Sequence, residues 1–492
     1  MSSDPYRGGI LKEDINKVVL NYTSSISHDN EIKQYVVDIT KAHVVILYEK
    51  NLIKLKEAKS ILSVLSELGD FELNYSTEDV HANLEALLIS KVGPELAGNV
   101  NLAKSRNDQV STAIRMALRE KIVKTMNQLL SLKEAMLSKS DELVDAIMPG
   151  YTHLQHAQPT TLAHYLLAHH DRIDRDFERL FELYKRVNMS PMGSGALATS
   201  SFQIDRNEEA LLLGFNGVLE NSIDAVSSRD FAVEALFNFS LIMTDLSSIA
   251  EEFVLWCTSE FNFVQLPDEF VSTSSIMPQK RNPIVAEMIR AKTSSTYGNL
   301  FSVMSIVKAL PLGYNLDLQE ITPHIWSSYE IVSSSLFVVR EMLLKAKFNT
   351  SKMYKEANDG VSTATELSNL LVKYGVPFRV SHKIVGSFLR SYANELSPQQ
   401  FCNYLKQNLN LSISLQEIEN CFNVKKVVES YNLVGGPASE EVKRAIKKRK
   451  EKLVYQSKEV NNLLDSLLSY KKALDKRVHE LLNLSEQLNL HL

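Results

Sequence analysis

Glycine and proline are scarce in this sequence, with 17 and 13 among 492 residues. Together they make up about half of the share that is usual in globular proteins. Neither occurs in residues 99–148, 160–190, 218–266, 324–359 or 438–492. Because these two residues interrupt helices and mark turns, such long gaps predict very long helices joined by short loops.

Three further shortages exclude whole classes of protein. No run of 18 apolar residues exists, so we expect no membrane-spanning helix. The formal charge is −5, without the concentrated basic excess that a nucleic-acid surface needs. Three widely spaced cysteines form no disulfide framework, and Met1–Pro5 lacks the apolar stretch of a secretory signal. We therefore expect a cytoplasmic protein with no nucleic-acid and no membrane partner.

Motifs for metals and phosphates are also missing. Glu78 and His81 have the spacing of one half of a carboxylate-bridged di-iron site, but no second such pair occurs. His153 and His156 lack the further ligands of a zinc site. The sequence contains neither a P-loop nor a Gly-x-Ser-x-Gly elbow. We expect no metal and no hydrolase triad.

Apolar residues instead follow helical periods. In the first long gap they form one stripe: Val110, Ile114, Ala117, Leu118, Ile122, Met126, Leu129 and Leu130. In the last gap they recur at strict sevens: Ile446, Leu453, Val460, Leu467, Leu474 and Leu481. Such a repeat is typical of a helical hairpin or a supercoiled seam. With no convincing alternating strands, the pattern predicts an all-α fold with a central bundle whose helices can exceed 40 residues.

Polar loops between the predicted helices divide the chain into three parts. We expect an N-terminal domain at residues 1–103, a central helical bundle at 104–354 and a smaller helical C-terminal domain at 355–492. Helices this long and apolar usually bury more than one side, so the sequence also predicts an oligomer.

The stretch from Ser272 to Pro283 is the most informative in the chain. Asn282 suits the N-cap of a helix and Pro283 its first position, so the sequence predicts a helix that starts at Asn282. The serines would then lie before a helix N-terminus, where free N–H groups and Lys280 favour negative charge. A hydroxyl held there loses its proton more easily than in water, and a carboxylate can dock beside it. The competing interpretation is an ordinary serine-rich loop that caps a helix.

Four further polar segments lie at the ends of the predicted helices: Ser105–Gln109, Gly150–Thr161, Ser190–Ala198 and Tyr314–Glu320. In the first, Arg106 offers a planar fork for a carboxylate, although a polar cap with a surface arginine is the commoner explanation. The second packs two histidines, two glutamines and three threonines into twelve residues, which favours a functional role. The third has a Gly-x-Gly that follows no strand. The fourth is equally compatible with a solvated helix junction.

These residue types suit one kind of chemistry. Hydroxyls, a lysine, an arginine, amides and a histidine fit a polycarboxylate substrate. They also fit removal of a proton beside a carboxylate, because the carbanion then spreads onto the carboxyl oxygens as a dianion. N–H groups and Lys280 placed beforehand would stabilise that transition state more than the ground state. A serine is an effective base only where its alkoxide is stabilised, which this loop offers.

Several segments together resemble a known family. Ser274 to Pro283 matches the fumarase/aspartase superfamily signature Gly-Ser-Ser-x-Met-Pro-x-Lys-x-Asn-Pro, with Thr273 in place of its glycine. Within that superfamily, the chain resembles the argininosuccinate lyase family from about residue 20 to Pro437. The matching segments are Ser105–Gln109, Pro149–Pro159 (with His156 for an arginine), Asn221–Ala225, Ser228–Phe231 and Tyr314–Glu320.

The resemblance implies a three-domain lyase that forms a homotetramer around a 20-helix core, with each active site built from three subunits. It implies reversible β-elimination of argininosuccinate to L-arginine and fumarate, in arginine biosynthesis and without metal or organic cofactor. By motif matching, Ser274 would take the Cβ proton, while Lys280 and Asn282 would hold the carboxylate and its aci-carboxylate form. His153 would assist the guanidinium leaving group as an acid, directly or through water, with Glu287 orienting it. The other implied substrate-binding residues are Ser25, His81, Arg106, Asn107, Thr152, Tyr314 and Gln319.

The chain departs from the family pattern at a few positions. Ala103 and Lys104 replace Gly-Arg before Ser105, which changes the reach of an anion contact. Thr273 would stiffen a loop that must close over substrate. Thr322 stands where many members carry a lysine. None of these changes removes a proposed catalytic group.

Two alternatives stay open at this point. A sister lyase acting on adenylosuccinate, fumarate or aspartate shares the serine loop but should lack the segments Ser105–Gln109 and Tyr314–Glu320. A non-catalytic, crystallin-like structural protein is disfavoured by retention of the proposed catalytic residues: His153, Ser274, Lys280 and Glu287.

Overall fold

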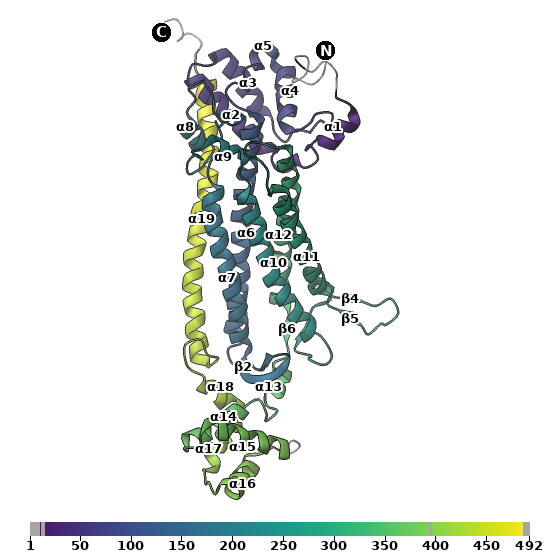
Figure 1. Ribbon diagram of the computed structural model, residues 1–492, viewed down its shortest axis with the longest axis vertical. Helices are drawn as coiled ribbons and strands as arrows, with labels where there is room; N and C mark the ends of the chain where they lie inside the picture. Colours follow the sequence, from purple (N-terminus) through teal and green to yellow (C-terminus); the bar gives the residue numbers. More distant parts are fainter. Residues whose placement is uncertain (1–9, 11–14, 393–395, 486–492) are drawn as a thin grey trace.

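The computed structural model describes residues 10, 15–392 and 396–485. Met1–Pro5, which carried the expectation of no secretory signal, lies outside the described residues. A bundle of five long helices runs along most of the molecule (Figure 1). They are α6 (Arg106–Glu142), α7 (Leu162–Val187), α10 (Asp230–Trp256), α11 (Ile284–Val307) and α12 (Ile321–Lys345).

Shorter helices gather at the two ends of this bundle (Figure 1). At the N-terminal end lie α1 (Lys17–Thr23), α2 (Lys33–Glu49), α3 (Leu55–Glu67), α4 (Val80–Val92), α5 (Pro94–Ala97), α8 (Arg206–Leu212) and α9 (Ser222–Ser227). At the other end lie α13 (Thr350–Ala357), α14 (Ala364–Lys373), α15 (Phe378–Ser391), α16 (Pro398–Leu409), α17 (Leu415–Phe422) and α18 (Val424–Ser430). Three 3₁₀ turns complete the helical elements: η1 (Asp29–Glu31), η2 (Asp268–Phe270) and η3 (Leu316–Glu320).

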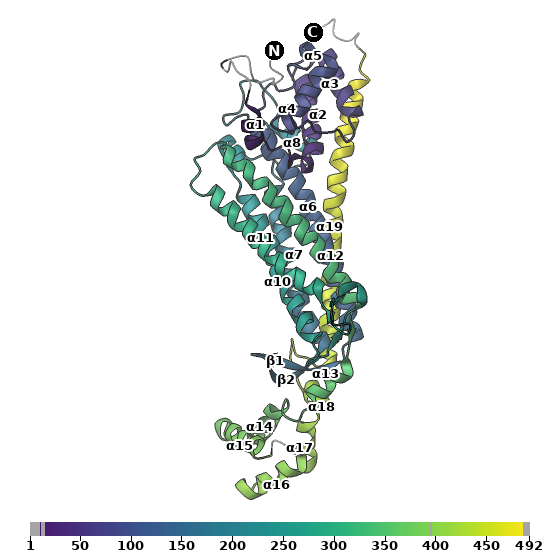
Figure 2. The same cartoon turned by 90° about the vertical axis from the view of Figure 1, so that its right-hand side faces the viewer.

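The last helix, α19 (Ser439–Leu482), returns along the whole bundle and packs against α6 (Figure 2). The predicted heptad residues face inward, since five of the six are buried and Leu453 is partly buried. The predicted stripe of α6 is buried as well, apart from half-buried Val110. Both periodicities and the all-α fold class are therefore confirmed. The expected length of the bundle helices is not confirmed, because these helices have 24 to 37 residues; in the described part of the chain only α19, with 44 residues, exceeds 40.

Two hydrophobic cores hold most of the described helices together, and two smaller clusters lie where α19 begins and where the β1–β2 hairpin meets α13 and α18. The larger runs through the bundle and the N-terminal helices and includes α19 residues from Val460 to Leu481. A smaller core, centred on Leu367, Phe388 and Phe401, holds α14 to α17 together beyond the end of the bundle (Figure 2). The domain boundaries stay a prediction, and α19 belongs by its packing to the bundle.

Helix α10 is long and apolar enough to cross a membrane by length and composition alone. It lies inside the bundle, in contact with α7, α11 and α12, and 56% of its most apolar window is buried there. Burial of this kind is typical of a core helix in a globular protein.

The described residues also form three short two-stranded sheets, which no alternation of apolar and polar residues in the sequence had indicated. The longest is an antiparallel hairpin of β1 (Ile147–Thr152) and β2 (Gln155–Thr161). Its register shifts between Pro149 and Tyr151, so alternation of apolar and polar residues never becomes regular. The others pair β3 (Val264–Gln265) with β6 (Lys347–Phe348) and β4 (Ser272–Thr273) with β5 (Arg281–Asn282).

The predicted helix start at Asn282 is also wrong. Asn282 pairs with Ser272 across the β4–β5 sheet, and α11 begins at Ile284 after Pro283. Closing the base of the loop as a β-ladder takes Asn282 out of the N-cap position. The serine-rich segment is thus the tip of a hairpin and not the immediate approach to a helix.

Candidate active site

Six of the predicted residues lie together at the N-terminal end of the bundle. We call this set the bundle-end cluster: Ser25, His81, Arg106, Asn107, Tyr314 and Gln319. Arg106 is its centre, because each of its three guanidinium nitrogens has a partner. Nε lies 2.5 Å from Asp79 Oδ2, Nη1 lies 2.9 Å from Glu78 Oε1, and Nη2 donates to Gln319 Oε1 at 3.3 Å.

Burial and charge set the protonation states in the bundle-end cluster. Burial disfavours the charged form of Arg106, but Asp79 and Glu78 outweigh this effect and raise its pKa. His81 is 7% exposed, and burial lowers its pKa to about 4, so the ring is neutral near pH 7. Burial raises the pKa of Tyr314, which keeps its phenol protonated. The cluster therefore combines one fixed cation with neutral donors.

The segment that carries Ser25 is tied into the bundle-end cluster by its backbone and by Asp29. Gln319 Nε2 donates to the Thr23 carbonyl at 2.8 Å. Ser25 Oγ donates a hydrogen bond to Asp29 Oδ2 at 3.0 Å. Asp29 Oδ2 also accepts a hydrogen bond from the backbone N–H of Val80 at 2.9 Å. Burial is the main cause that raises the pKa of Asp29 to about 6.

Thr152 and His153 occupy the tip of the β1–β2 hairpin, at the opposite end of the bundle (Figure 1). Thr152 pairs with Gln155, and the two residues between them, His153 and Leu154, have φ of 55° and 57°. Two successive left-handed residues make the turn that suits a two-residue hairpin, at some cost for residues other than glycine. The turn leaves His153 exposed, at the outer point of the hairpin.

Ser274 lies just beyond the short β4–β5 sheet, in a hairpin that projects from the side of the bundle (Figure 1). We call residues 272–283 the signature loop. Ser274 Oγ accepts the backbone N–H groups of Ile276 at 3.3 Å and Met277 at 3.2 Å. Lys280 and Glu287 are exposed on the same projection, Glu287 in the first turn of α11. The donors around the serine thus belong to the loop itself and not to the helix N-terminus that the sequence suggested.

One chain cannot bring these three groups of residues together. Helix α6 separates Arg106 from the β1–β2 hairpin by 37 residues, which is about 55 Å of helix. Helix α11 separates the signature loop from Tyr314 by 24 residues, which is about 36 Å. Both helices are continuous, so the separations are fixed by rigid elements.

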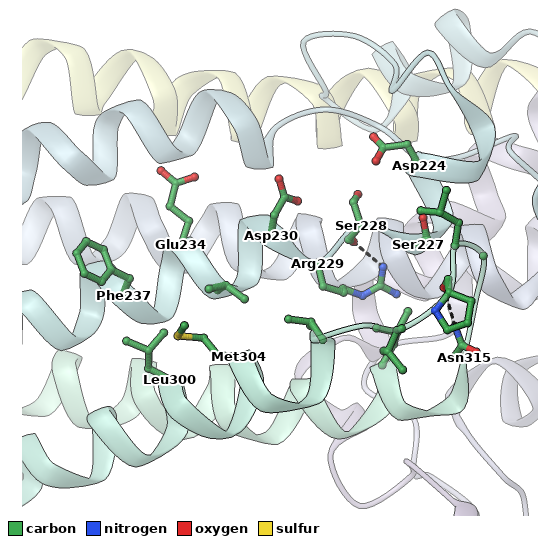
Figure 3. A pocket seen from close by; sticks show the side chains of 17 residues that line it. Asp224, Ser227, Ser228, Arg229, Asp230, Glu234, Phe237, Leu300, Met304 and Asn315 are labelled. Carbon is green, nitrogen blue, oxygen red and sulfur yellow. Dashed lines mark hydrogen bonds between the residues drawn. The ribbon is translucent and has the colours of Figure 1, made fainter.

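A cavity of ≈ 770 Å³ lies between the start of α10 and the end of α11 (Figure 3). None of the predicted site residues lines it, although Asn315 is a neighbour of Tyr314. Arg229, which is 3% exposed, contributes to its wall and donates to the Ser228 carbonyl at 2.8 Å. The rest of the wall is mainly apolar, with Phe237, Leu300 and Met304. This hollow continues the exposed apolar face of α11.

Comparison with known proteins decides the family. A family model described as lyase matches residues 9–298, and one described as argininosuccinate lyase C-terminal matches residues 361–429. The argininosuccinate lyase of Methanothrix thermoacetophila is 44% identical over 89% of this chain and 92% of its own length. That of Methanocaldococcus jannaschii is 41% identical over 95% and 97%. The chain belongs to the argininosuccinate lyase family.

Solved structures of other lyases share the fold of this chain. An EDDS lyase in complex with formate has a TM-score of 0.83 and 27% identity, with 92% of each chain covered. The class II fumarase of Schistosoma mansoni has a TM-score of 0.70 at 17% identity, covering 80% of this chain and 90% of its own. The fumarase therefore supports the fold alone.

The departures from the family motifs have structural explanations. Ala103, in the place of the motif's glycine, has φ of 66°, the left-handed region that favours glycine. Lys104 is partly exposed, and burial lowers its pKa to about 8 against the opposing effect of nearby carboxylates, Glu209 first. Thr273 lies in strand β4, where its β-branched side chain suits the extended backbone. Thr322 is 7% exposed in the first turn of α12.

His156, in the place of the motif's arginine, still holds the hairpin. Its Nδ1 lies 3.0 Å from Asp359 Oδ2, and its ring packs edge-on against Tyr151 at 5.3 Å. An ion pair between the hairpin and the segment after α13 is therefore possible whenever His156 is protonated.

Sequence reasoning missed three carboxylates that organise the bundle-end cluster: Asp29, Glu78 and Asp79. Asp79 caps α4 by accepting the Ala82 N–H at 2.7 Å, so a helix-start pattern could have located it. No pattern in the sequence signals that Asp79 and Glu78 meet Arg106, because the two carboxylates lie just before α4 and Arg106 begins α6, with the whole of α4 and α5 between them.

Proposed function

We propose that the protein catalyses the reversible β-elimination of argininosuccinate to L-arginine and fumarate. The observation that carries the proposal is the environment of Ser274, whose Oγ accepts two backbone N–H groups at the start of the signature loop, directly after β4. Hydrogen bonds to the charged form of a group stabilise that form. They thus favour the alkoxide that a serine base requires. The substrate comes from the activity for which the relatives are named, which are 41% and 44% identical to this chain over most of its length.

In the proposed first step, Ser274 takes the proton from Cβ of the succinyl moiety. The electron pair left behind spreads into the adjacent carboxylate, which becomes an aci-carboxylate dianion. Lys280 and Asn282 would hold this group, since charge that develops in the transition state is stabilised best by donors already in place. Asn282 is fixed by its pairing with Ser272, and this rigidity is the feature that such a donor needs.

In the second step, the C–N bond breaks and the leaving guanidine is protonated. His153 would supply this proton, directly or through water, from the hairpin tip, and Glu287 would orient the imidazole. Collapse of the dianion then gives fumarate. No step calls on a metal ion or an organic cofactor, and we propose none.

We further propose a homotetramer in which each site combines three chains. Helices of about 55 Å and about 36 Å keep the three groups of site residues apart within one chain. One face of α11 exposes the side chains of Tyr297 (46%), Phe301 (73%) and Met304 (51%), which lie within about 60° of one another around the helix. A contiguous apolar face of this kind marks an interface. Five long helices from each of four chains would give the 20-helix core that the family resemblance implies.

Fumarate release measures the proposed activity directly. Purified protein is supplied with argininosuccinate, and ultraviolet absorbance is followed, with adenylosuccinate and aspartate as parallel substrates. We expect turnover of argininosuccinate alone by a species with the mass of a tetramer. No turnover by the folded tetramer would contradict the proposal, and turnover of adenylosuccinate or aspartate would identify a sister lyase. Residence in the cytoplasm is part of the proposal and is checked by fractionation.

A further inference from the structure

A buried histidine on α2 ties together three segments at the N-terminal end of the bundle. His43 Nδ1 lies 2.9 Å from Glu209 Oε1 on α8, and His43 Nε2 lies 2.7 Å from the carbonyl oxygen of Leu102. The side chains of His43 and Glu209 are fully buried. Leu102 belongs to the segment that leads into α6, whose first residue is Arg106. The imidazole therefore contacts the approach to the bundle-end cluster, although His43 is not a member of that cluster.

The two contacts of the ring determine where its protons lie. A carbonyl oxygen only accepts hydrogen bonds, so His43 Nε2 carries a proton. His43 Nδ1 faces a carboxyl oxygen, so a second proton lies between the ring and Glu209. With Glu209 ionised, the ring is an imidazolium that donates from both nitrogens. A buried ion pair of this kind can cost more in desolvation than it returns, so a gain in stability does not by itself account for it.

The carbonyl group of Leu102 depends on the imidazole for its hydrogen bond. In the part of the chain that the structure describes, this carbonyl accepts no other hydrogen bond. The next residue, Ala103, has φ of 66°, which is unfavourable for a residue other than glycine. A strained residue persists only where the surrounding structure holds it in place. The ring of His43 holds the chain on one side of Ala103, and Ser105, the N-cap of α6, holds it on the other.

The same segment sets the direction in which α6 begins, and the first two residues of α6 are predicted to bind substrate. Ser105 Oγ accepts the N–H of Asn107 at 3.3 Å, and the N–H of Ser105 donates to Asp108 Oδ1 at 2.9 Å. Asn107 Nδ2 donates to the Ala196 carbonyl at 3.1 Å. A change in the path of the chain before Ser105 would therefore move Arg106 and Asn107 together.

We propose that the pair of His43 and Glu209 positions the start of α6 for substrate binding, by way of the Leu102 carbonyl. Both side chains are too deeply buried to touch the substrate themselves. The proposal rests on the proposed function, in which Arg106 and Asn107 bind argininosuccinate. These two residues would contact the substrate in the ground state and in the transition state alike. A displaced start of α6 should therefore raise KM and leave kcat nearly unchanged.

The main test replaces both partners by leucine, as His43→Leu with Glu209→Leu, so that no buried charge is left without its partner. Steady-state kinetics with argininosuccinate should show a KM at least about tenfold higher and a kcat within about threefold of wild type. Amide hydrogen exchange of residues 102–107, followed by mass spectrometry, should become faster, because the segment loses its tether. An unchanged KM, or unchanged exchange in this segment, would overturn the proposal.

Glu209→Gln alone separates the effect of the tether from the effect of the charges. The new amide donates its own N–H to His43 Nδ1, and Nε2 still donates to the Leu102 carbonyl. We expect a KM within about threefold of wild type and normal exchange of residues 102–107, because every hydrogen bond of the ring is kept. A rise in KM as large as that of the double variant would show that the charges act directly, and the proposed tether would be wrong.

The matched control is His169→Leu with Glu252→Leu, which removes another largely buried histidine–glutamate pair, 2.7 Å apart between α7 and α10. It should leave KM and the exchange of residues 102–107 unchanged. Thermal unfolding checks that each variant is folded. Turnover by the wild type tests the proposed function alone, and the exchange measurement needs no turnover. Failure of the lyase activity and failure of the positioning role are therefore detected separately.

Discussion

The bundle-end cluster and the signature loop differ in how much of the chain surrounds their side chains. Around Arg106, each guanidinium nitrogen lies within 3.3 Å of a side-chain oxygen of the same chain, and Asp79 and His81 are buried. Around Ser274, the side chain rests on two N–H groups of its own loop, and Lys280 and Glu287 face outward. The first region is completed by its own fold, and the second presents its groups to something outside the chain.

This difference separates recognition from chemistry. A region completed within one chain contributes to folding stability as well as to binding, so substitutions there should alter both. An exposed loop contributes little to the stability of the chain, so substitutions there should alter the reaction alone. Substitutions in each region test this difference separately.

The largest effect belongs to Ser274→Ala in the signature loop. Removal of the general base should lower kcat by about 10²–10⁴-fold. The KM for argininosuccinate should stay within about tenfold, because the hydroxyl acts mainly in the transition state. The melting temperature should not change, since the side chain lies on an exposed hairpin. Steady-state kinetics and thermal unfolding measure these quantities, and a variant with near-normal kcat would show that another group is the base.

The second effect concerns Asp29 in the bundle-end region and appears as pH dependence. Its folded pKa of about 6 lies above the ordinary 3.8, so the folded chain binds this proton more tightly than the unfolded chain. The associated stability is present below about pH 4 and is lost as the pH rises through 6. The Asp29→Asn variant has no carboxyl group to ionise at this position, so its stability does not fall for this reason as the pH rises. We therefore expect the variant to gain stability relative to wild type between pH 4 and pH 7, by up to about 3 kcal/mol.

Unfolding curves at pH 4, 5, 6 and 7, at one protein concentration, measure the gain. The control is Asp268→Asn, which changes an aspartate whose side chain is 91% exposed and which pairs with Arg281 at the base of the signature loop. This control should change the stability of the chain by less than about 0.5 kcal/mol, because substitutions of exposed side chains are usually small in effect. If the stability of Asp29→Asn differed from that of the wild type by the same amount at every pH, the carboxyl group of Asp29 would not be held in a buried site.

The smallest effect is expected at Ala103, immediately before the bundle-end arginine. Its φ of 66° is strained for an L-residue, and glycine would relieve that strain in the folded chain. Glycine also raises the conformational entropy of the unfolded chain, which offsets part of the gain in stability. Ala103→Gly should stabilise the fold by about 0.5–1 kcal/mol. Ala97→Gly, within helix α5, should destabilise it by about the same amount. Thermal unfolding of both variants tests the sign, and a loss of stability in Ala103→Gly would contradict the strain argument.

Prediction from the sequence succeeded for the long helices and failed for the hairpins that connect them. The stripe on α6 and the heptads of α19 were predicted correctly, because burial on one face leaves a periodic pattern in the chain. The hairpin that holds His153 was missed, since Pro149, Gly150 and a register shift disturb its alternation. The helix start after the signature loop was misplaced, because pairing of Asn282 with Ser272 overrides the local preference for an N-cap.

The sequence by itself determined the family, the helical class and the identity of the groups that could do the chemistry. These follow from local motifs and periodicities, which are properties of neighbouring residues. Only the tertiary structure decided that Ser274 is supported by Ile276 and Met277, and that Arg106 is shared among Glu78, Asp79 and Gln319. It also separated the three groups of site residues by the lengths of α6 and α11. Contacts between distant segments depend on how rigid helices pack, and no local pattern in the chain encodes that geometry.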